Sequence, residues 1–362
     1  MNIPQKPCKY LYLSIISQPS DNQDITYPYK SLKVLHMEFR TEIEVSPSRF
    51  RINSDSKLIT IGSCFSEVLG NQLSENKIQC LCNPYGTVFN PVSIFKLVSH
   101  SLQNQPVFKH LFLENKGVWH HYDFHSKFWS DSRERLEAEL NATHQSVSQF
   151  LKKANYLVIT LGTAIVHQLK ENSQIISNCH KMPSNHFNKE MLTVKDISLR
   201  FKAMYEQLKM HNSKIKIILT VSPVRHTREI LQLNSVSKSI LRSACYSLEQ
   251  DFADVEYFPS YEIMMDDLRD YRFYKADMIH PNEVAEQYIF EKFSEVYFTE
   301  EMKQFISEWG KIKTSLNHRP MQSGTESHQK FLNDLLTKLN HFNTKADVRN
   351  EIRMIESQLI QN

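Results

Sequence analysis

The sequence predicts an α/β protein with three layers, in which helices cover both faces of a mostly parallel sheet. Short continuous apolar runs, typical of strands buried on both faces, occur at 58–62, 156–162, 215–222 and 255–259. Between and after these runs the apolar residues change to helical spacing. Strands that alternate with helices indicate a parallel sheet, whose ligands bind beyond the carboxyl ends of the strands.

The predicted strands are rich in β-branched or aromatic residues, and they read "LITIG", "YLVITLG", "IKIILTVS" and "VEYFP". The predicted helices cover 64–76, 132–152, 195–211 and 236–252, and a fifth follows Pro281. In the first helix Phe65, Leu69 and Leu73 share one apolar face, as expected of a helix that packs on a sheet.

Three regions are predicted in the chain of 362 residues: an N-terminal extension over 1–36, an α/β domain over 37–298 and a helical extension over 299–362. Residues 1–36 show no clear period, and "MEFRTEIEV" is typical of a natural N-terminus. We therefore expect 1–36 to be disordered, or to derive from an upstream start codon. The apolar patch "YLYLSII" lacks a small-residue cleavage site, so it does not predict a signal peptide.

The C-terminal region carries two apolar stripes at helical spacing, made of Leu332, Leu335, Leu336, Leu339 and Phe342, and of Val348, Ile352, Ile355 and Leu359. The stripes predict a helical hairpin, and the polar stretch 317–329 reads as a linker. Because an apolar stripe must be covered, the hairpin packs on the domain or pairs with a second chain as a homodimer.

Composition narrows the classes of function. The net charge of +3 is too small to favour a nucleic-acid or anionic-membrane partner, and no apolar run approaches the roughly 18 residues of a membrane helix. The six cysteines form no CxxC pair and no dense framework, so reduced thiols and a cytoplasmic location are expected.

The stretch "KLITIGSCFSEVLG" places two nucleophile-type residues, Ser63 and Cys64, where a predicted strand turns into a helix. Gly62 permits a sharp turn, and a nucleophile there would stand at the positive end of the following helix. The alternative is structural, because serine is a good N-cap and cysteine is often a small buried hydrophobe.

The stretch "DMIHP" places Asp277 three residues before His280 on a predicted turn. Asp277 can accept the Nδ1 proton of the imidazole, which leaves Nε2 of His280 free as a general base. Pro281 can start the next helix. The alternative is a helix-capping aspartate beside a surface histidine.

Other polar residues could support such a site. The turn in "NPYGTVFNP" could aim the Gly86 amide at a ligand oxygen, and Thr163 follows a buried strand. Histidines in "WHHYDFH", "NCHK" and "SPVRH" lie in loops, and His121, His180 and His226 are candidate substrate contacts. Their spacing matches no tight ligand template, so we expect no metal and no cofactor.

Five blocks, in order, resemble the GSCFA-domain family, which is placed with the SGNH (GDSL-like) hydrolases: "GSCFS", "NPYGTVFNP", "NCHK", "SPVRH" and "YEIMMDDLRDYRFYKADMIHP". The resemblance covers about 38–296 and implies a flavodoxin-like α/β/α fold. It carries the late Asp-x-x-His block of SGNH enzymes to Asp277 and His280. It also implies Gly86 as an oxyanion donor. Gly162 and Thr163 stand where a Gly-x-Asn-Asp block is expected, so the third donor would be Thr163 or Asn178.

Aligning the Gly-Asp-Ser block of SGNH enzymes with Gly62, Ser63 and Cys64 puts Cys64 in the nucleophile position. As the first helical residue, Cys64 would gain from unpaired amides that lower the pKa of its thiol. A one-residue shift of the turn would present Ser63 instead. The resemblance thus implies an ester hydrolase for a small-molecule or carbohydrate acyl ester. An acyltransferase and an inactive sugar- or partner-binding module remain alternatives.

Overall fold

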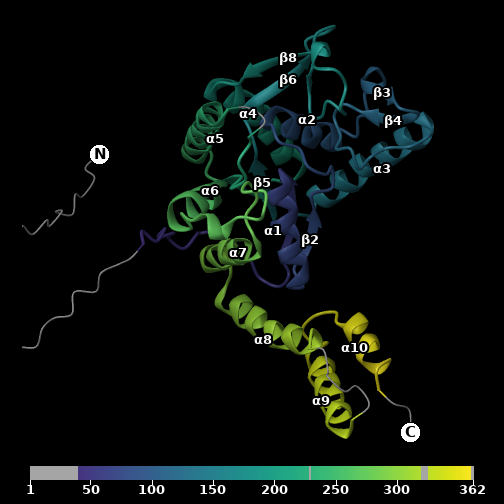
Figure 1. Cartoon of the computed structure of the whole chain (residues 1–362), viewed down its shortest axis with the longest axis vertical. Helices are drawn as coiled ribbons and strands as arrows, with labels where there is room; N and C mark the ends of the chain where they lie inside the picture. Colours follow the sequence, from purple (N-terminus) through teal and green to yellow (C-terminus); the bar gives the residue numbers. More distant parts are fainter. Residues whose placement is uncertain (1–39, 228–229, 319–324, 360–362) are drawn as a thin grey trace, which may run out of the picture. The chain divides into compact units, whose positions relative to one another are not determined.

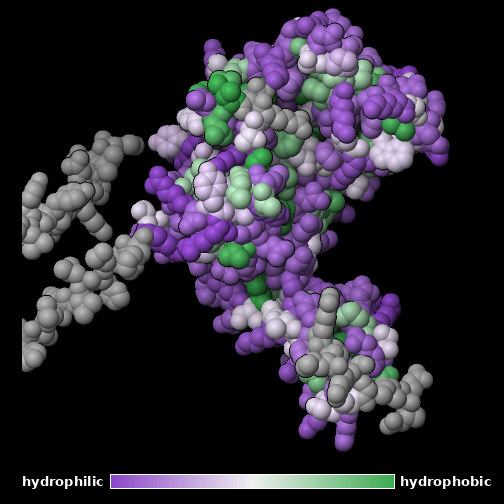
Figure 2. Space-filling model, viewed as in Figure 1, coloured by the Kyte–Doolittle hydropathy of each residue, from purple (hydrophilic) through white to green (hydrophobic). Residues whose placement is uncertain are grey.

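The computed structural model describes residues 40–227, 230–318 and 325–359, which belong to one compact unit, Arg40–Asn362. The extension expected over 1–36 lies outside the described residues. Among the described helices, none is long and apolar enough to cross a membrane. The face of the molecule drawn in Figure 2 is mostly hydrophilic, with small separate hydrophobic areas.

A parallel sheet of five strands forms the centre of the described chain (Figure 1). Its strands are β1 (Lys57–Gly62), β2 (Gln79–Cys82), β5 (Tyr156–Leu161), β9 (Lys216–Val221) and β10 (Val255–Phe258). They lie in the order β10-β9-β5-β1-β2. This is the doubly wound, flavodoxin-like order, in which the direction of winding reverses between β1 and β5. The predicted three-layer α/β/α fold is confirmed.

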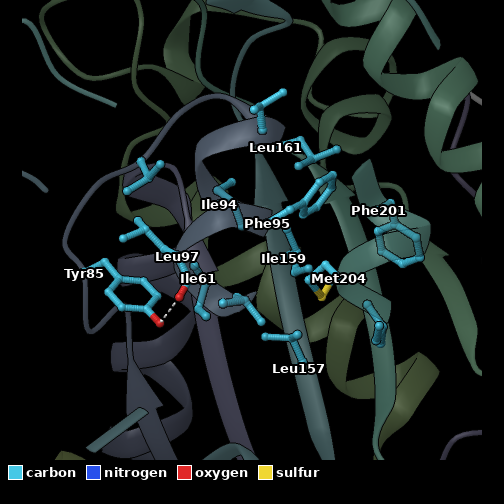
Figure 3. Close-up of a cluster of buried hydrophobic side chains, with 14 of the residues drawn as sticks. Ile61, Tyr85, Ile94, Phe95, Leu97, Leu157, Ile159, Leu161, Phe201 and Met204 are labelled. Atoms are coloured by element: carbon cyan, nitrogen blue, oxygen red, sulfur yellow. Dashed lines mark hydrogen bonds between the residues drawn. The ribbon is translucent and has the colours of Figure 1, made fainter. Parts of the chain in front are cut away.

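Alternate side chains of each strand enter two separate cores. Leu58 and Val158 pack with Phe65 of α1 and with Ile289 of α7 in one core. The neighbouring side chains face the opposite core, which lies between the sheet and the helices α2 to α5. Figure 3 shows this second core, where residues from strands, helices and a loop meet: Ile61, Leu157, Ile159, Leu161, Phe95, Phe201, Met204 and Tyr85.

Six long helices surround the sheet: α1 (Cys64–Glu75), α2 (Pro91–Leu102), α3 (Arg133–Leu151), α4 (Val194–His211), α5 (Leu231–Asp251) and α7 (Glu283–Tyr297). Five of them are the predicted ones, and α2 was not predicted. The prediction that Pro281 starts the last helix is wrong. That helix begins at Glu283, Asn282 caps it by accepting from the Ala285 amide, and Pro281 instead pairs with Tyr274 in a β-bridge.

Smaller elements extend the domain beyond the sheet edge. The hairpin of β3 (Phe112–Asn115) and β4 (Val118–His121) follows α2, and β6 (Ile165–Leu169), β7 (Ile175–Ile176) and β8 (Phe187–Met191) form a second antiparallel sheet. Short helical turns complete it: η1 (Lys109–Leu111), η2 (Ser184–His186), α6 (Ser260–Glu262), η3 (Ile263–Asp267) and η4 (Tyr271–Phe273).

The C-terminal region contains the helices α8 (Glu300–Leu316), α9 (Glu326–Phe342) and α10 (Arg349–Glu356). Their apolar stripes are buried against one another in a separate small core around Trp309 and Leu339. The Trp309 indole donates to the Glu75 carbonyl at the end of α1, 2.7 Å away. The stripes are thus covered within the chain, and pairing as a homodimer through these helices stays a prediction.

Candidate active site

The corner between β1 and α1 is built on Gly62. Its φ is +141°, and a Cβ at this position would lie 2.2 Å from the Thr160 carbonyl oxygen of β5. The Gly62 amide donates to Asn83 Oδ1 (3.0 Å), and the Ser63 amide donates to the Thr160 carbonyl (3.0 Å). The corner therefore sits where the winding of the sheet reverses, the usual place for a ligand on this fold.

Ser63 and Cys64 differ in access to solvent at this corner. Ser63 occupies the N-cap position of α1, but its side chain makes no capping bond, and it is fully buried with no hydrogen-bond partner for Oγ in the described residues. Cys64 is the first residue of α1 and is partly exposed. A nucleophile must reach its substrate, so the geometry favours Cys64 over the buried Ser63.

Cys64 and His280 line the same cavity, which has a volume of about 280 Å³. The remaining lining residues are Phe65, Glu67, Val68, Asn71, Val224, Lys275, Pro281 and Glu286. The Lys275 ammonium and the Glu286 carboxylate form an ion pair of 3.0 Å on this wall. The fold thus brings together two motifs that are more than two hundred residues apart in the sequence.

The electrostatics of Cys64 differ from the sequence expectation. Burial raises the pKa of its thiol, and the nearby Glu67 acts in the same direction. The amides of Phe65 and of Cys64 itself, and the charge of Lys238, act to lower that pKa but do not outweigh burial. The prediction that the start of α1 lowers the pKa of the Cys64 thiol is therefore wrong. Desolvation of the thiolate raises this pKa by more than the amides of the helix lower it.

Asp277 and His280 form the predicted pair. Oδ2 of Asp277 lies 2.7 Å from Nδ1 of His280. Oδ1 of Asp277 accepts from the amides of Ile279 (2.9 Å) and His280 (3.0 Å). These two amides, with the His280 ring, lower the pKa of Asp277 to about 2. The carboxylate is therefore ionised at neutral pH, Nδ1 is the donor, and Nε2 is left to accept a proton.

The three proposed oxyanion donors are engaged elsewhere. The Gly86 amide donates to the Asn83 carbonyl (2.8 Å) within its own turn. The Thr163 hydroxyl pairs with Ser237 Oγ (3.0 Å), and the Asn178 side-chain amide donates to Ser126 Oγ (3.0 Å). None of the three lines the cavity, so the structure does not support them as donors to a substrate there.

The three candidate substrate histidines also lie outside the cavity lining. His121 and His180 are buried, and burial lowers the pKa of each imidazole to about 4. The His226 ring packs edge-on against Phe89, with ring centres 5.0 Å apart. Among the described residues no group of three or more His, Cys, Asp or Glu side chains is placed to hold a metal ion.

The sequence did not reveal three groups that the structure places around Cys64: Lys238, the pair of Lys275 and Glu286, and the amide of Phe65. Lys238 is a single lysine on an amphipathic helix, and no local motif marks it. Lys275 stands two residues before Asp277 and Glu286 six residues after His280, so their proximity to the Asp-x-x-His block was a usable signal. The Phe65 amide could also have been named, because the first amides of a helix lack intrahelical partners.

Comparisons with known proteins identify the family. The GSCFA family model matches residues 57–293, and the model described as "GSCFA domain protein, C-terminal domain" matches residues 309–361. No curated protein matches the chain. The first match spans more than half of the sequence, so the chain belongs to the GSCFA family.

Several solved structures are similar at low identity. A carbohydrate esterase family 3 protein from Talaromyces cellulolyticus is 10% identical with a TM-score of 0.32, over 70% of this chain and 99% of that one. A family two carbohydrate esterase from Clostridium thermocellum is 12% identical (TM-score 0.30), over 74% and 68%. The acetyl xylan esterase Est2A from Butyrivibrio proteoclasticus is 12% identical (TM-score 0.29), over 72% and 66%. At this level of similarity the function must be argued from the residues of this chain.

Proposed function

We propose that this member of the GSCFA family is an ester hydrolase with Cys64 as nucleophile, His280 as general base and Asp277 as the residue that orients His280. One observation carries the proposal: Cys64 and His280 line one cavity, and His280 is held through Nδ1 by the Asp277 carboxylate. Nucleophile, base and orienting carboxylate are the three roles of a Cys-His-Asp site.

The reaction proceeds in two steps. His280 Nε2 takes the proton from the Cys64 thiol, and the sulfur attacks the ester carbonyl to form a tetrahedral intermediate. The C–O bond then breaks, the alcohol leaves with the proton from His280, and a thioester to Cys64 remains. In the second step His280 deprotonates a water, which attacks the thioester, releases the carboxylic acid and restores the thiol.

The amides of Cys64 and Phe65 are the donors we assign to the developing oxyanion. Both act to lower the pKa of the Cys64 thiol, which supports a place for them beside the nucleophile. They belong to the first turn of α1, whose positive end favours negative charge. They replace Gly86, Thr163 and Asn178 in this role.

A short acyl group fits the site best. The cavity of about 280 Å³ lies at the small end of ligand pockets, and Phe65, Val68 and Val224 give it an apolar wall. Lys275 and Glu286 offer polar contacts for the alcohol side of the ester. An O-acylated carbohydrate is the substrate class that the resemblance to SGNH hydrolases implies, and we propose it on that basis.

One observation favours a second candidate function, a binding module without catalysis. The glycine, threonine and asparagine expected to complete an oxyanion hole are bonded elsewhere. In that case the same cavity would bind a sugar or a partner without turning it over.

Hydrolysis of p-nitrophenyl acetate and butyrate by three variants tests the proposal. We expect Cys64→Ala and His280→Ala to lose at least about a hundredfold in kcat/KM, since each removes a group that acts in the transition state. Ser63→Ala should retain most activity. Cys82→Ala is the matched control, because Cys82 is a half-buried thiol near α1 that does not line the cavity.

The outcomes separate the alternatives. Full turnover by His280→Ala would show that the proposed mechanism is wrong. No turnover by the wild-type chain, together with labelling of Cys64 by iodoacetamide that does not depend on His280, would favour the binding module. Turnover that appears only when an alcohol acceptor is supplied would indicate an acyltransferase, which uses the same thioester.

A further inference from the structure

Glu67 places an exposed carboxylate on the wall of the cavity that Cys64 lines. It follows Cys64 by three residues on α1, and side chains three apart on a helix are neighbours on one face. Within the part of the chain that the structure describes, the Glu67 carboxylate forms no ion pair. A group that enters the cavity toward Cys64 therefore meets a carboxylate whose charge is not balanced by a bonded cation.

The other charged groups around this cavity leave the charge of Glu67 in place. On the wall, the Lys275 ammonium is paired with the Glu286 carboxylate at 3.0 Å, so their charges cancel. The His280 ring lies 2.7 Å from Oδ2 of Asp277, whose pKa of about 2 keeps that carboxylate ionised at neutral pH. With a neutral imidazole, this second pair adds a further negative charge. The surroundings of Cys64 thus carry an excess of negative charge.

Three positive side chains in this part of the fold are held elsewhere, and none of them lines the cavity. Arg225 donates to the Tyr274 hydroxyl at 3.0 Å. Lys238 is buried and donates to the Ser222 carbonyl at 2.8 Å. Lys127 lines a different cavity. None of these side chains is a counterion for Glu67 inside the cavity of Cys64.

Asn71 adds a second acceptor to the same wall. It stands four residues after Glu67 on α1, on the same helix face, and it also lines the cavity. Its Oδ1 accepts from the Cys82 thiol at 3.5 Å and, as an amide oxygen, has a second lone pair. An ammonium carries three donors and no acceptor, and its hydrogen bonds to a carboxylate are about twice as strong as those of a neutral hydroxyl.

We propose that Glu67 is a specificity-determining residue that selects esters whose alcohol part carries a positively charged group, with Asn71 as a second acceptor, and that it disfavours anionic esters. The inference rests on the proposed function, because it assigns the alcohol part of the ester to this wall. The acyl group then lies against the apolar side chains of the cavity. The charge preference itself does not depend on turnover and is measured separately.

The rates at which charged thiol reagents modify Cys64 in the full chain test this selection. Cationic [2-(trimethylammonium)ethyl] methanethiosulfonate and anionic (2-sulfonatoethyl) methanethiosulfonate react with the same thiolate, which displaces methanesulfinate and forms a mixed disulfide. The ratio of the two rates, divided by the ratio for free 2-mercaptoethanol, therefore reports the charge of the cavity and not the pKa of the thiol. Peptide mass spectrometry reads Cys64 separately from the other cysteines.

We expect a normalised ratio of about ten or more in favour of the cation at low salt, because a charge a few Å away changes each rate roughly threefold in opposite directions. The preference should shrink at about 1 M salt, which screens charges. Glu67→Gln keeps the size of the side chain and should lower the ratio by about fivefold or more.

Glu75→Gln is the matched control. It removes a carboxylate from the last turn of the same helix, where Glu75 is paired with Lys313 at 2.8 Å and does not line the cavity. This variant should keep the wild-type ratio. A wild-type ratio at or below one, or an equal ratio in wild type and Glu67→Gln, would overturn the proposal.

Two acetate esters provide the second measurement. Acetylcholine and its uncharged isostere 3,3-dimethylbutyl acetate carry the same acyl group, so the ratio of their kcat/KM values isolates the effect of the charge. We expect wild type to prefer acetylcholine by about threefold or more, and Glu67→Gln to lose this preference. Hydrolysis of both esters without a preference would overturn the inference and leave the proposed function standing. Turnover of neither ester, with a reagent ratio that falls in Glu67→Gln, would count against the hydrolysis alone.

Discussion

Gly62 is the residue on which the corner between β1 and α1 depends. With φ at +141° and a backbone oxygen 2.2 Å from the place of a Cβ, any side chain would push β1 away from β5. We expect Gly62→Ala to lower the free energy of unfolding by at least about 3 kcal/mol, or to prevent folding. Urea denaturation monitored by circular dichroism measures the change.

Gly310 provides the matched control for that substitution. It lies inside α8, and a Cβ there would meet no atom within 4 Å. Gly310→Ala should therefore be neutral or stabilising, by up to about 1 kcal/mol, since alanine is the better helix former. A Gly62→Ala protein as stable as Gly310→Ala would contradict the described corner.

If the proposed mechanism holds, Asp277 should matter for turnover because it orients His280. Asp277→Asn keeps the size of the side chain but cannot accept the Nδ1 proton in the same way, so His280 loses its fixed tautomer. We expect kcat on p-nitrophenyl acetate to fall by about 10²–10⁴-fold with little change in stability. Because the pKa of Asp277 is about 2, its protonation should add no acid limb to the wild-type rate profile above about pH 3.

At the level of single residues, the candidate site could be predicted only where a short sequence motif marks it. Cys64 and His280 could be named as candidates because each lies in a compact pattern next to a strand end or a turn, and the structure places both on one cavity. Whether Gly86, Thr163 and Asn178 are available as donors could not be read from the sequence, because the availability of a donor depends on its neighbours. The carbonyl of Asn83 already occupies the Gly86 amide, and no sequence pattern records that bond.

Among the elements, the edge of the sheet was the hardest to predict. The strand β2 reads "QCLC", and its side chains are half exposed or exposed, so it lacks the continuous apolar run of a central strand. The helix α5 begins at Leu231, five residues before the predicted start at 236. The prediction missed this first part because Leu231, Leu233 and Val236 are exposed and do not form a buried apolar face. The helix α2 carried a usable signal, since Asn90 caps it and Pro91 is its first residue.

Trp309 should anchor the C-terminal helices. Its indole donates to Glu75 at the end of α1, stacks on Phe342 with ring centres 5.2 Å apart, and lies under the Lys77 ammonium at 4.9 Å. We expect Trp309→Ala to lower the free energy of unfolding by about 3–5 kcal/mol, and Trp309→Phe, which loses mainly the hydrogen bond, by about 1 kcal/mol. Thermal and urea unfolding of both variants measure the difference, and equal losses would argue against the bond.

For the molecule as a whole, the three layers and the mostly parallel sheet could be predicted from the sequence, but the loops beyond the sheet could not. Continuous apolar strands with alternating helices leave few topologies open. The histidine-containing stretches "WHHYDFH" and "NCHK", in contrast, read as surface loops, yet the structure buries His121 in the first and His180 in the second. It also buries His144 of α3. Burial of a titratable ring depends on contacts between distant segments, so sequence pattern alone could not locate it.

These buried histidines predict how the stability of the whole protein depends on pH. Burial lowers the pKa of His121, His144 and His180 to about 4, below the usual value near 6.5. Between these two values the unfolded chain binds more protons than the folded one, so the free energy of unfolding must rise with pH from about 4 to 6.5. Each ring contributes up to about 1.4 kcal/mol per pH unit.

Urea unfolding at a series of pH values measures this slope, and two variants on α3 identify its source. His144→Phe fills the same space without titrating, so it should flatten the slope by up to about 1.4 kcal/mol per pH unit. Leu140→Val, a control buried on the same helix, should lower stability by about 1 kcal/mol at every pH and leave the slope intact. A wild-type slope in His144→Phe would mean that the His144 imidazole binds its proton equally well in the folded and unfolded wild-type protein. That result would contradict the lowering of its pKa by burial.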